Sequence, residues 1–110
     1  MNEQTIEEGK SNAIISYLTI IGTIIAFYLN QDKKNEYSSF HIRQALGLWL
    51  TFFALGYIIG GFDSWLITLT WYIFFGVIFI FGFMTAITGR TQPTPIVGPL
   101  YQKLFASLGK

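Results

Sequence analysis

Three hydrophobic blocks alternate with short polar segments along the chain. They cover 13–29, 40–60 and 65–87, and a helix of about 20 residues crosses a hydrocarbon core of about 30 Å. In lipid such a stretch must satisfy its own backbone hydrogen bonds, which a helix does locally. The pattern therefore predicts an all-α fold, an integral membrane three-helix bundle occupying 13–87.

The first block is the shortest of the three and has a competing interpretation as a cleaved signal peptide. Its preceding segment is acidic rather than basic, and no small-residue cleavage site follows Leu29. We therefore expect a retained span.

Polar segments separate the predicted spans. Residues 1–12 form a polar N-terminal tail, 30–39 a connection with both signs of charge, and 60–64 a tight turn. Asp63 and Ser64 in this turn can cap the third helix.

The segment 88–110 has a different pattern. Its prolines prevent a continuous helix, and apolar residues then recur at helical spacing, which predicts a short interfacial amphipathic helix. A disordered tail is the alternative. The apolar positions are Leu100, Tyr101, Leu104, Phe105 and Leu108.

Basic residues fall mainly on one side of this three-span arrangement. The side with the N-terminal tail and the 60–64 turn has Lys10 alone. The other side carries Lys33, Lys34, Arg43, Arg90, Lys103 and Lys110. Because cytoplasmic segments are enriched in Lys and Arg, the sequence predicts the N-terminus outside and the C-terminus in the cytoplasm.

Composition excludes several classes of function. The chain is 52% hydrophobic and 12% charged, unlike a soluble domain. A net charge of +1 without a run of Lys or Arg argues against nucleic acid as a partner. One His and no Cys are far short of a metal site. We therefore expect no enzymatic activity, no metal and no cofactor.

The second span opens with the one cluster of polar side chains attached directly to an apolar helix. On a helix His41 and Gln44 share a face and Arg43 points elsewhere. One interpretation is that His41 or Gln44 hydrogen-bonds the proline-containing segment 91–99, while Arg43 faces lipid headgroups. The other is a contact with a partner protein. The candidate interaction site comprises Phe40, His41, Arg43, Gln44, Pro93, Pro95, Gly98 and Gln102.

Small residues four positions apart occur in each block and allow helices to approach closely. We expect them to serve packing within the chain first and self-association second, so that Gly56→Leu destabilises the protein. The pairs are Gly22 and Ala26, Gly56 and Gly60, and Gly82 and Ala86.

Two motifs support a family resemblance. Phe40-His41-Ile42-Arg43-Gln44-Ala45-Leu46 opens a span, and Pro93-x-Pro95-x-x-Gly98-Pro99-Leu100-Tyr101-Gln102-Lys103-Leu104-Phe105 closes the chain. With the first span, they resemble a family of small bacterial membrane proteins that is distantly similar to the Tic-twenty-like import component of the chloroplast inner envelope. The resemblance implies a multi-pass protein of the bacterial plasma (inner) membrane and a link to protein translocation or insertion.

Two functions are consistent with these features. The first is a non-catalytic accessory or scaffold protein whose partners are the lipid bilayer and other membrane proteins or further copies of itself. The second is a minimal oligomeric channel or transporter for a solute. The first is favoured because the central parts of the spans carry no charged residue, which a proton or ion pathway normally needs.

Overall fold

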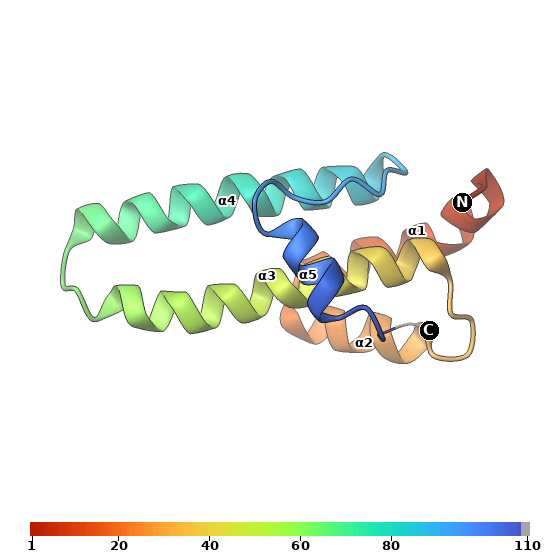
Figure 1. Ribbon diagram of the computed structural model, residues 1–110, viewed down its shortest axis with the longest axis horizontal. Coiled ribbons are helices and arrows are strands. Elements are labelled where there is room, and N and C mark those ends of the chain that lie inside the picture. The colour runs from red at the N-terminus through yellow and green to blue at the C-terminus, as the bar shows by residue number, and fades with distance from the viewer. Residues whose placement is uncertain (109–110) are drawn as a thin grey trace.

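The computed structural model describes residues 1–108, and its described elements are all helices. The molecule is elongated, with extents of 47 × 22 × 22 Å (Figure 1). The helices are α1 (Glu3–Leu18), α2 (Ile20–Asn30), α3 (Glu36–Gly60), α4 (Trp65–Ile87) and α5 (Gly98–Leu104). Lys110, counted above among the basic residues, lies outside the described part.

An antiparallel pair formed by α3 and α4 runs the length of the molecule (Figure 1). At 1.5 Å per residue, 25 and 23 residues give helices of about 37 Å and 34 Å, enough to cross a hydrocarbon core of about 30 Å. Both are long and apolar enough to span a membrane. The bounds of α4 coincide with the predicted third span, and Ser64 caps it as expected, accepting from the Ile67 N–H at 3.4 Å.

The first predicted span, 13–29, is wrong because the helix breaks inside it. Thr19 adopts an extended conformation, with φ −157° and ψ 172°, and the chain turns back on itself as α2. The Thr19 side chain accepts from the Gly22 N–H, while Thr23 Oγ1 donates to the Ser16 carbonyl at 2.6 Å. These bonds satisfy backbone groups that the break frees, which makes a turn tolerable at membrane depth.

Gly22 is required at this turn by a close backbone approach. A Cβ atom on Gly22 would lie 2.2 Å from the Ile15 carbonyl oxygen of α1. The glycine that suggested helix–helix packing therefore packs the hairpin formed by α1 and α2, and Ala26 is also fully buried.

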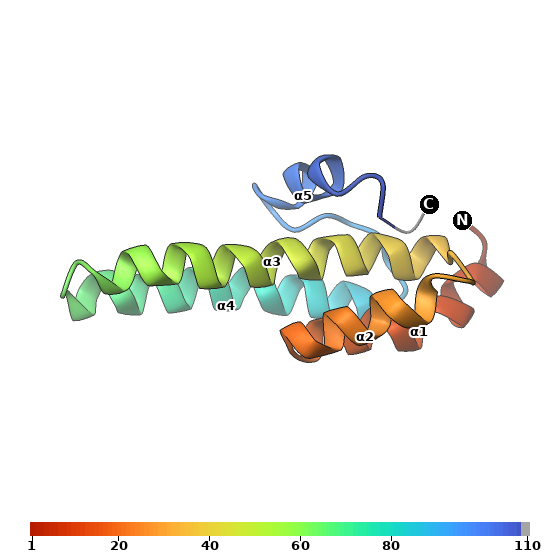
Figure 2. The ribbon, with the colours of Figure 1, turned by 90° about the horizontal axis from the view of Figure 1, so that it is seen from below.

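The hairpin changes the predicted topology. The N-terminus, the α2–α3 connection and the C-terminal end of the described chain all lie at one end of the molecule, and the turn between α3 and α4 lies at the other (Figures 1 and 2). The three-helix bundle and the placement of the two termini on opposite sides are thus both corrected. The N-terminal tail is also helical from Glu3, since Asn2 caps α1.

The C-terminal segment, from Arg90 onward, folds back along α4 and does not extend away from the helices. From Arg90 the chain runs beside α4 as far as Pro95 and Ile96, which line a groove with Val77 and Ile78, and then returns as α5 (Figure 2). The predicted interfacial helix is therefore shorter than expected, because α5 ends at Leu104, and it lies across α3.

One of the small-residue pairs does not pack. Gly82 and Ala86 are buried, and a Cβ on Gly82 would lie 3.0 Å from the Tyr17 ring. At Gly60 no atom lies within 4 Å of such a Cβ, and at Gly56 only the Trp71 indole nitrogen does, at 3.6 Å. The expected destabilisation by Gly56→Leu is therefore withdrawn, since Gly56 and Gly60 line an open pocket with Trp71 and Tyr72 of α4 and make no close helix contact.

Candidate functional site

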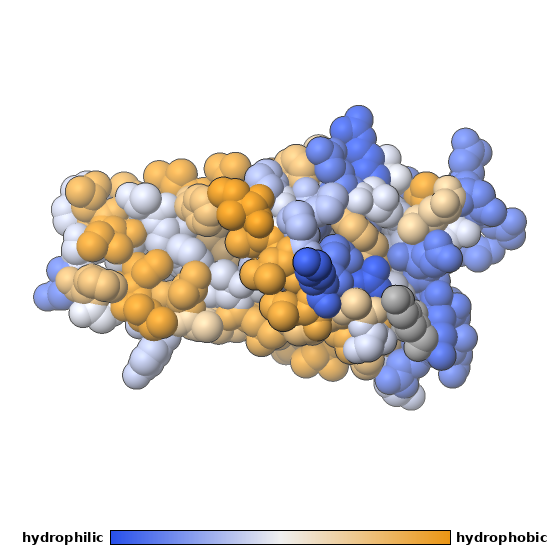
Figure 3. All heavy atoms as spheres, in the orientation of Figure 1, coloured by the Kyte–Doolittle hydropathy of each residue, from blue (hydrophilic) through white to orange (hydrophobic). Residues whose placement is uncertain are grey.

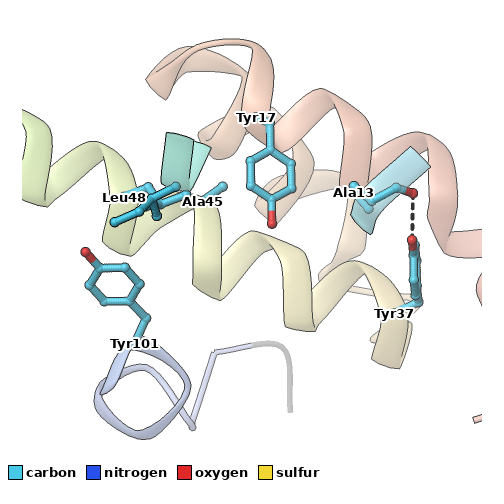
Figure 4. Packing of buried hydrophobic residues seen from close by; sticks show 8 residues of the cluster. Ala13, Tyr17, Tyr37, Ala45, Leu48 and Tyr101 are labelled. Carbon is cyan, nitrogen blue, oxygen red and sulfur yellow. Dashed lines mark hydrogen bonds between the residues drawn. The ribbon is translucent and has the colours of Figure 1, made fainter. Parts of the chain in front are cut away.

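Polar side chains from three segments meet on the first half of α3. Tyr17 comes from α1, His41 and Gln44 come from successive turns of α3, and the 90–94 backbone comes from the segment after α4. Both α3 side chains are fully buried. Figure 4 shows Tyr17 pointing from α1 toward α3, near Ala45.

A continuous chain of hydrogen bonds links these groups. Gln44 Oε1 accepts from the Thr94 N–H at 2.8 Å, and Gln44 Nε2 donates to the Tyr17 hydroxyl at 2.8 Å. The Tyr17 hydroxyl lies 2.7 Å from His41 Nδ1, and His41 Nε2 lies 2.7 Å from the Arg90 carbonyl. A carbonyl only accepts, so Nε2 carries the proton and Nδ1 accepts from Tyr17. His41 is thus the neutral Nε2–H tautomer.

The hydrogen bond expected between this end of α3 and segment 91–99 is confirmed by the Gln44–Thr94 contact. In this bond the Thr94 backbone N–H donates and the Gln44 side chain accepts. The His41 contact falls one residue before that segment, at Arg90.

A second set of bonds fastens α3 to the neighbouring helices near its start. The Tyr37 hydroxyl donates to the Ala86 carbonyl at the end of α4 at 2.6 Å, and Ser38 Oγ donates to the Gly9 carbonyl of α1 at 2.8 Å. Asn35 caps α3 and also donates to the Thr5 carbonyl at 2.9 Å. Side chains of the α2–α3 connection and the α3 start therefore hold α1 and α4 in place.

The C-terminal segment is held by Arg43, which was expected to face headgroups. Arg43 Nε donates to Gln102 Oε1 at 2.8 Å, and its NH1 group donates to the Leu108 carbonyl at 2.9 Å. Gln102 Nε2 donates in turn to the Phe40 carbonyl at 2.9 Å. Arg43 differs from the expectation because α5 and the residues after it cover this face of α3 and supply acceptors within the chain.

Tyr101 anchors α5 on α3. Its ring lies directly over Gly47, where a Cβ would be 2.2 Å from the ring, and its hydroxyl hydrogen-bonds Thr51 Oγ1 (Figure 4 shows the ring beside Leu48). Burial raises the pKa of the Tyr101 phenol. The phenol therefore stays neutral at physiological pH.

The remaining candidates shape the turn before α5. A Cβ on Gly98 would lie 2.8 Å from the Pro93 ring, so Gly98 permits a close contact with half-buried Pro93. Pro95 is exposed and lines the apolar groove beside α4. The structure thus brings the candidate residues into contacts within the chain, and only Pro95 among them is exposed.

Sequence reasoning missed Tyr17, Tyr37 and Gly47. Tyrosine near the end of a predicted span is typical of the interfacial aromatic belt. The sequence therefore gives no sign that Tyr17 and Tyr37 are buried and hydrogen-bonded. Four positions after Gly47 stands Thr51 and not a second Gly or Ala, and only the docking of Tyr101 makes Gly47 necessary.

The side chains of this site hold segments of the chain together. Each polar atom of the Tyr17–His41–Gln44 chain is matched to a protein partner. Within residues 1–108, no three His, Cys, Asp or Glu side chains gather as a metal site would require.

Tyr17→Phe should lower the free energy of unfolding by about 1–2 kcal/mol, because it leaves Gln44 Nε2 and His41 Nδ1 buried without their partner at almost unchanged volume. Thermal unfolding in detergent micelles measures the change. Tyr57→Phe is the matched control, since Tyr57, on α3, is 87% exposed. Equal stability of both variants would show that the chain of bonds contributes nothing.

Residues 8–101 match the model of the magnetosome magnetite crystal formation protein family (MamF/MmsF). Searches of curated proteins and of solved structures returned no significant match. The family match corrects the resemblance to the bacterial relatives of the Tic-twenty-like component, because it covers the 40–46 motif and most of the 93–105 motif and assigns them to a different family. The translocation link rested on that resemblance alone and is not retained.

Proposed function

The chain belongs to the magnetosome magnetite crystal formation protein family, and on this basis we propose that it takes part in magnetite crystal formation as a non-catalytic membrane protein. Two helices long and apolar enough to span a bilayer support the membrane location. The finer location in a bacterial plasma membrane stays a prediction.

One observation carries the non-catalytic part of the proposal. Three fully buried polar side chains, Tyr17, His41 and Gln44, bond one another and the backbone of the 90–94 segment. Buried side chains committed in this way hold segments of the chain together and do not reach a substrate at the surface. We infer that the protein acts through the shape and surface that these bonds maintain.

Its partners under this proposal are the bilayer and other membrane proteins. The outward faces of the spans are apolar, with Trp65 77% and Val77 63% exposed. The alternative of a solute channel has less support, because α3 beyond Gln44 and all of α4 lack Asp, Glu, Lys, Arg and His.

Deleting the gene in its host tests this function. We expect magnetite crystals of altered size or number by electron microscopy, restored by the wild-type gene. Crystals unchanged by the deletion would contradict the role in crystal formation, and solute-specific conductance of the purified protein in planar bilayers would favour the channel.

A further inference from the structure

Packing in this molecule is confined to one half of its length. The buried residues of α3 all lie from Tyr37 to Leu48, with none from residue 49 to the helix end. In α4, Trp71 apart, they all lie from Ile78 onward. In one half of the molecule, here called the wide half, α1, α2 and the C-terminal segment pack around α3 and α4. The other, narrow half consists of the α3–α4 pair alone (Figures 1 and 2).

The α1–α2 hairpin has the length and surface of an insertion into one leaflet. Eleven residues of α2 extend about 16 Å, roughly half of a 30 Å hydrocarbon core. Its outward side is apolar, with Ile21 65%, Ile24 61% and Tyr28 72% exposed. Such a surface requires acyl chains around it, and the helix ends in the polar residues that begin the α2–α3 connection.

The C-terminal segment enters the same half. Ile96, at its turning point, is 80% exposed and lies beside Val77 and Ile78, near the middle of α4. Its extended backbone is supported by Gln44 and His41, as irregular backbone at membrane depth must be. Two independent re-entrant elements thus widen one half of the molecule.

The distribution of basic residues indicates on which side of the membrane the wide half lies. The end that carries it holds every basic residue of the described chain, whereas the narrow end presents Asp63 in the turn between α3 and α4. Figure 3 shows hydrophilic side chains gathered at the wide end. The bias of Lys and Arg places this end on the cytoplasmic side.

We propose that the protein is a membrane wedge that binds preferentially to curved bilayers whose convex leaflet holds the two re-entrant elements. A helix with side chains is about 10–12 Å across, so α1 and α2 together add roughly 200 Å² to one leaflet and nothing to the other. Bending toward that leaflet provides the extra area, as it does for amphipathic helices inserted on one side. This preference is a property of the single chain and does not depend on its role in crystal formation.

Membrane tethers pulled from giant vesicles test the wedge. The chain has no cysteine, so Lys33→Cys in the exposed α2–α3 connection carries one dye. The full-length labelled protein is reconstituted into phosphatidylcholine–phosphatidylglycerol vesicles, and a non-permeant quencher distinguishes the two orientations. Protein with its dye outside, on the convex side of the tether, should be enriched on the tether by about threefold, which corresponds to roughly 0.7 kcal/mol per molecule. Protein with its dye inside should be depleted.

Two glycine-to-leucine substitutions distinguish the effect of losing the α1–α2 hairpin from the effect of adding a leucine elsewhere in the chain. Gly22→Leu prevents the α1–α2 turn, because its Cβ would lie 2.2 Å from a backbone oxygen, and should bring the tether enrichment close to one. Gly76→Leu is the matched control in the narrow half, where no atom lies within 4 Å of the new Cβ, and should keep the enrichment.

The wild-type measurement decides the proposal even if Gly22→Leu fails to fold by circular dichroism. Equal densities on tether and vesicle in both orientations, or enrichment with the dye inside, would overturn it. A deletion strain with normal crystals would leave the tether result unaffected, so the wedge and the proposed function fail separately.

Discussion

A cysteine placed in α1 should be labelled from the same side of the membrane as one placed in the α2–α3 connection or α5. The chain has no native cysteine, so Glu7→Cys, Lys33→Cys and Lys103→Cys, all at exposed positions, give clean single sites. We expect a non-permeant maleimide to reach all three only from the cytoplasmic side. The effect is all or none, because a charged reagent does not cross the hydrocarbon core.

Phe62→Cys, in the exposed turn between α3 and α4, serves as the opposite-side control and should be labelled only from outside. If Glu7→Cys were labelled together with Phe62→Cys, the α1–α2 hairpin would open into a third span. The wedge would then lose one of its two re-entrant elements.

Gly47→Leu should lower the free energy of unfolding by about 3 kcal/mol, the upper part of the range for overpacking a filled site. The new Cβ would lie 2.2 Å from the Tyr101 ring, so α5 must leave α3. Its departure also breaks the Thr51–Tyr101 hydrogen bond and separates Gln102 from Arg43. Thermal unfolding in detergent measures the loss, and protease cleavage after Lys103 reports the release of α5.

Gly60→Leu is the matched control for this substitution, made on the same helix with the same change in size. No atom lies within 4 Å of its new Cβ, and we expect a change within about 0.5 kcal/mol. Gly47→Leu with wild-type stability and wild-type protease resistance would show that α5 is not docked on α3.

The polar cluster explains how a chain of this composition tolerates irregular backbone among apolar helices. The break at Thr19 and the non-helical stretch at 90–97 each expose backbone groups, and each finds hydroxyl, amide or imidazole partners within the chain. In the hydrocarbon region no water replaces such partners. His41 and Gln44 are therefore needed at this boundary for the shape of the molecule.

The pattern of residues alone determined the parts of this fold that depend on local chemistry. An uncharged 23-residue block can satisfy its backbone in lipid only as a helix, so α4 was predicted with its observed bounds. Ser64 as its cap follows from the side-chain oxygen that serine brings to a helix start. Proline at 93, 95 and 99 likewise predicted a non-helical stretch and a new helix after it.

Tertiary structure alone decided the break at Thr19 and the docking of the C-terminal segment. The sequence 13–29 is equally compatible with one helix, and it bends because Gly22 can lie against the Ile15 carbonyl and Tyr17 can reach His41 and Gln44. From the sequence alone, Arg43 was expected to face lipid headgroups. In the folded chain, α5 places Gln102 Oε1 2.8 Å from Arg43 Nε. The hydrogen bonds of Tyr17 and Arg43 join side chains 24 to 59 positions apart in the chain, and no local periodicity records them, because they form only when separate helices pack together.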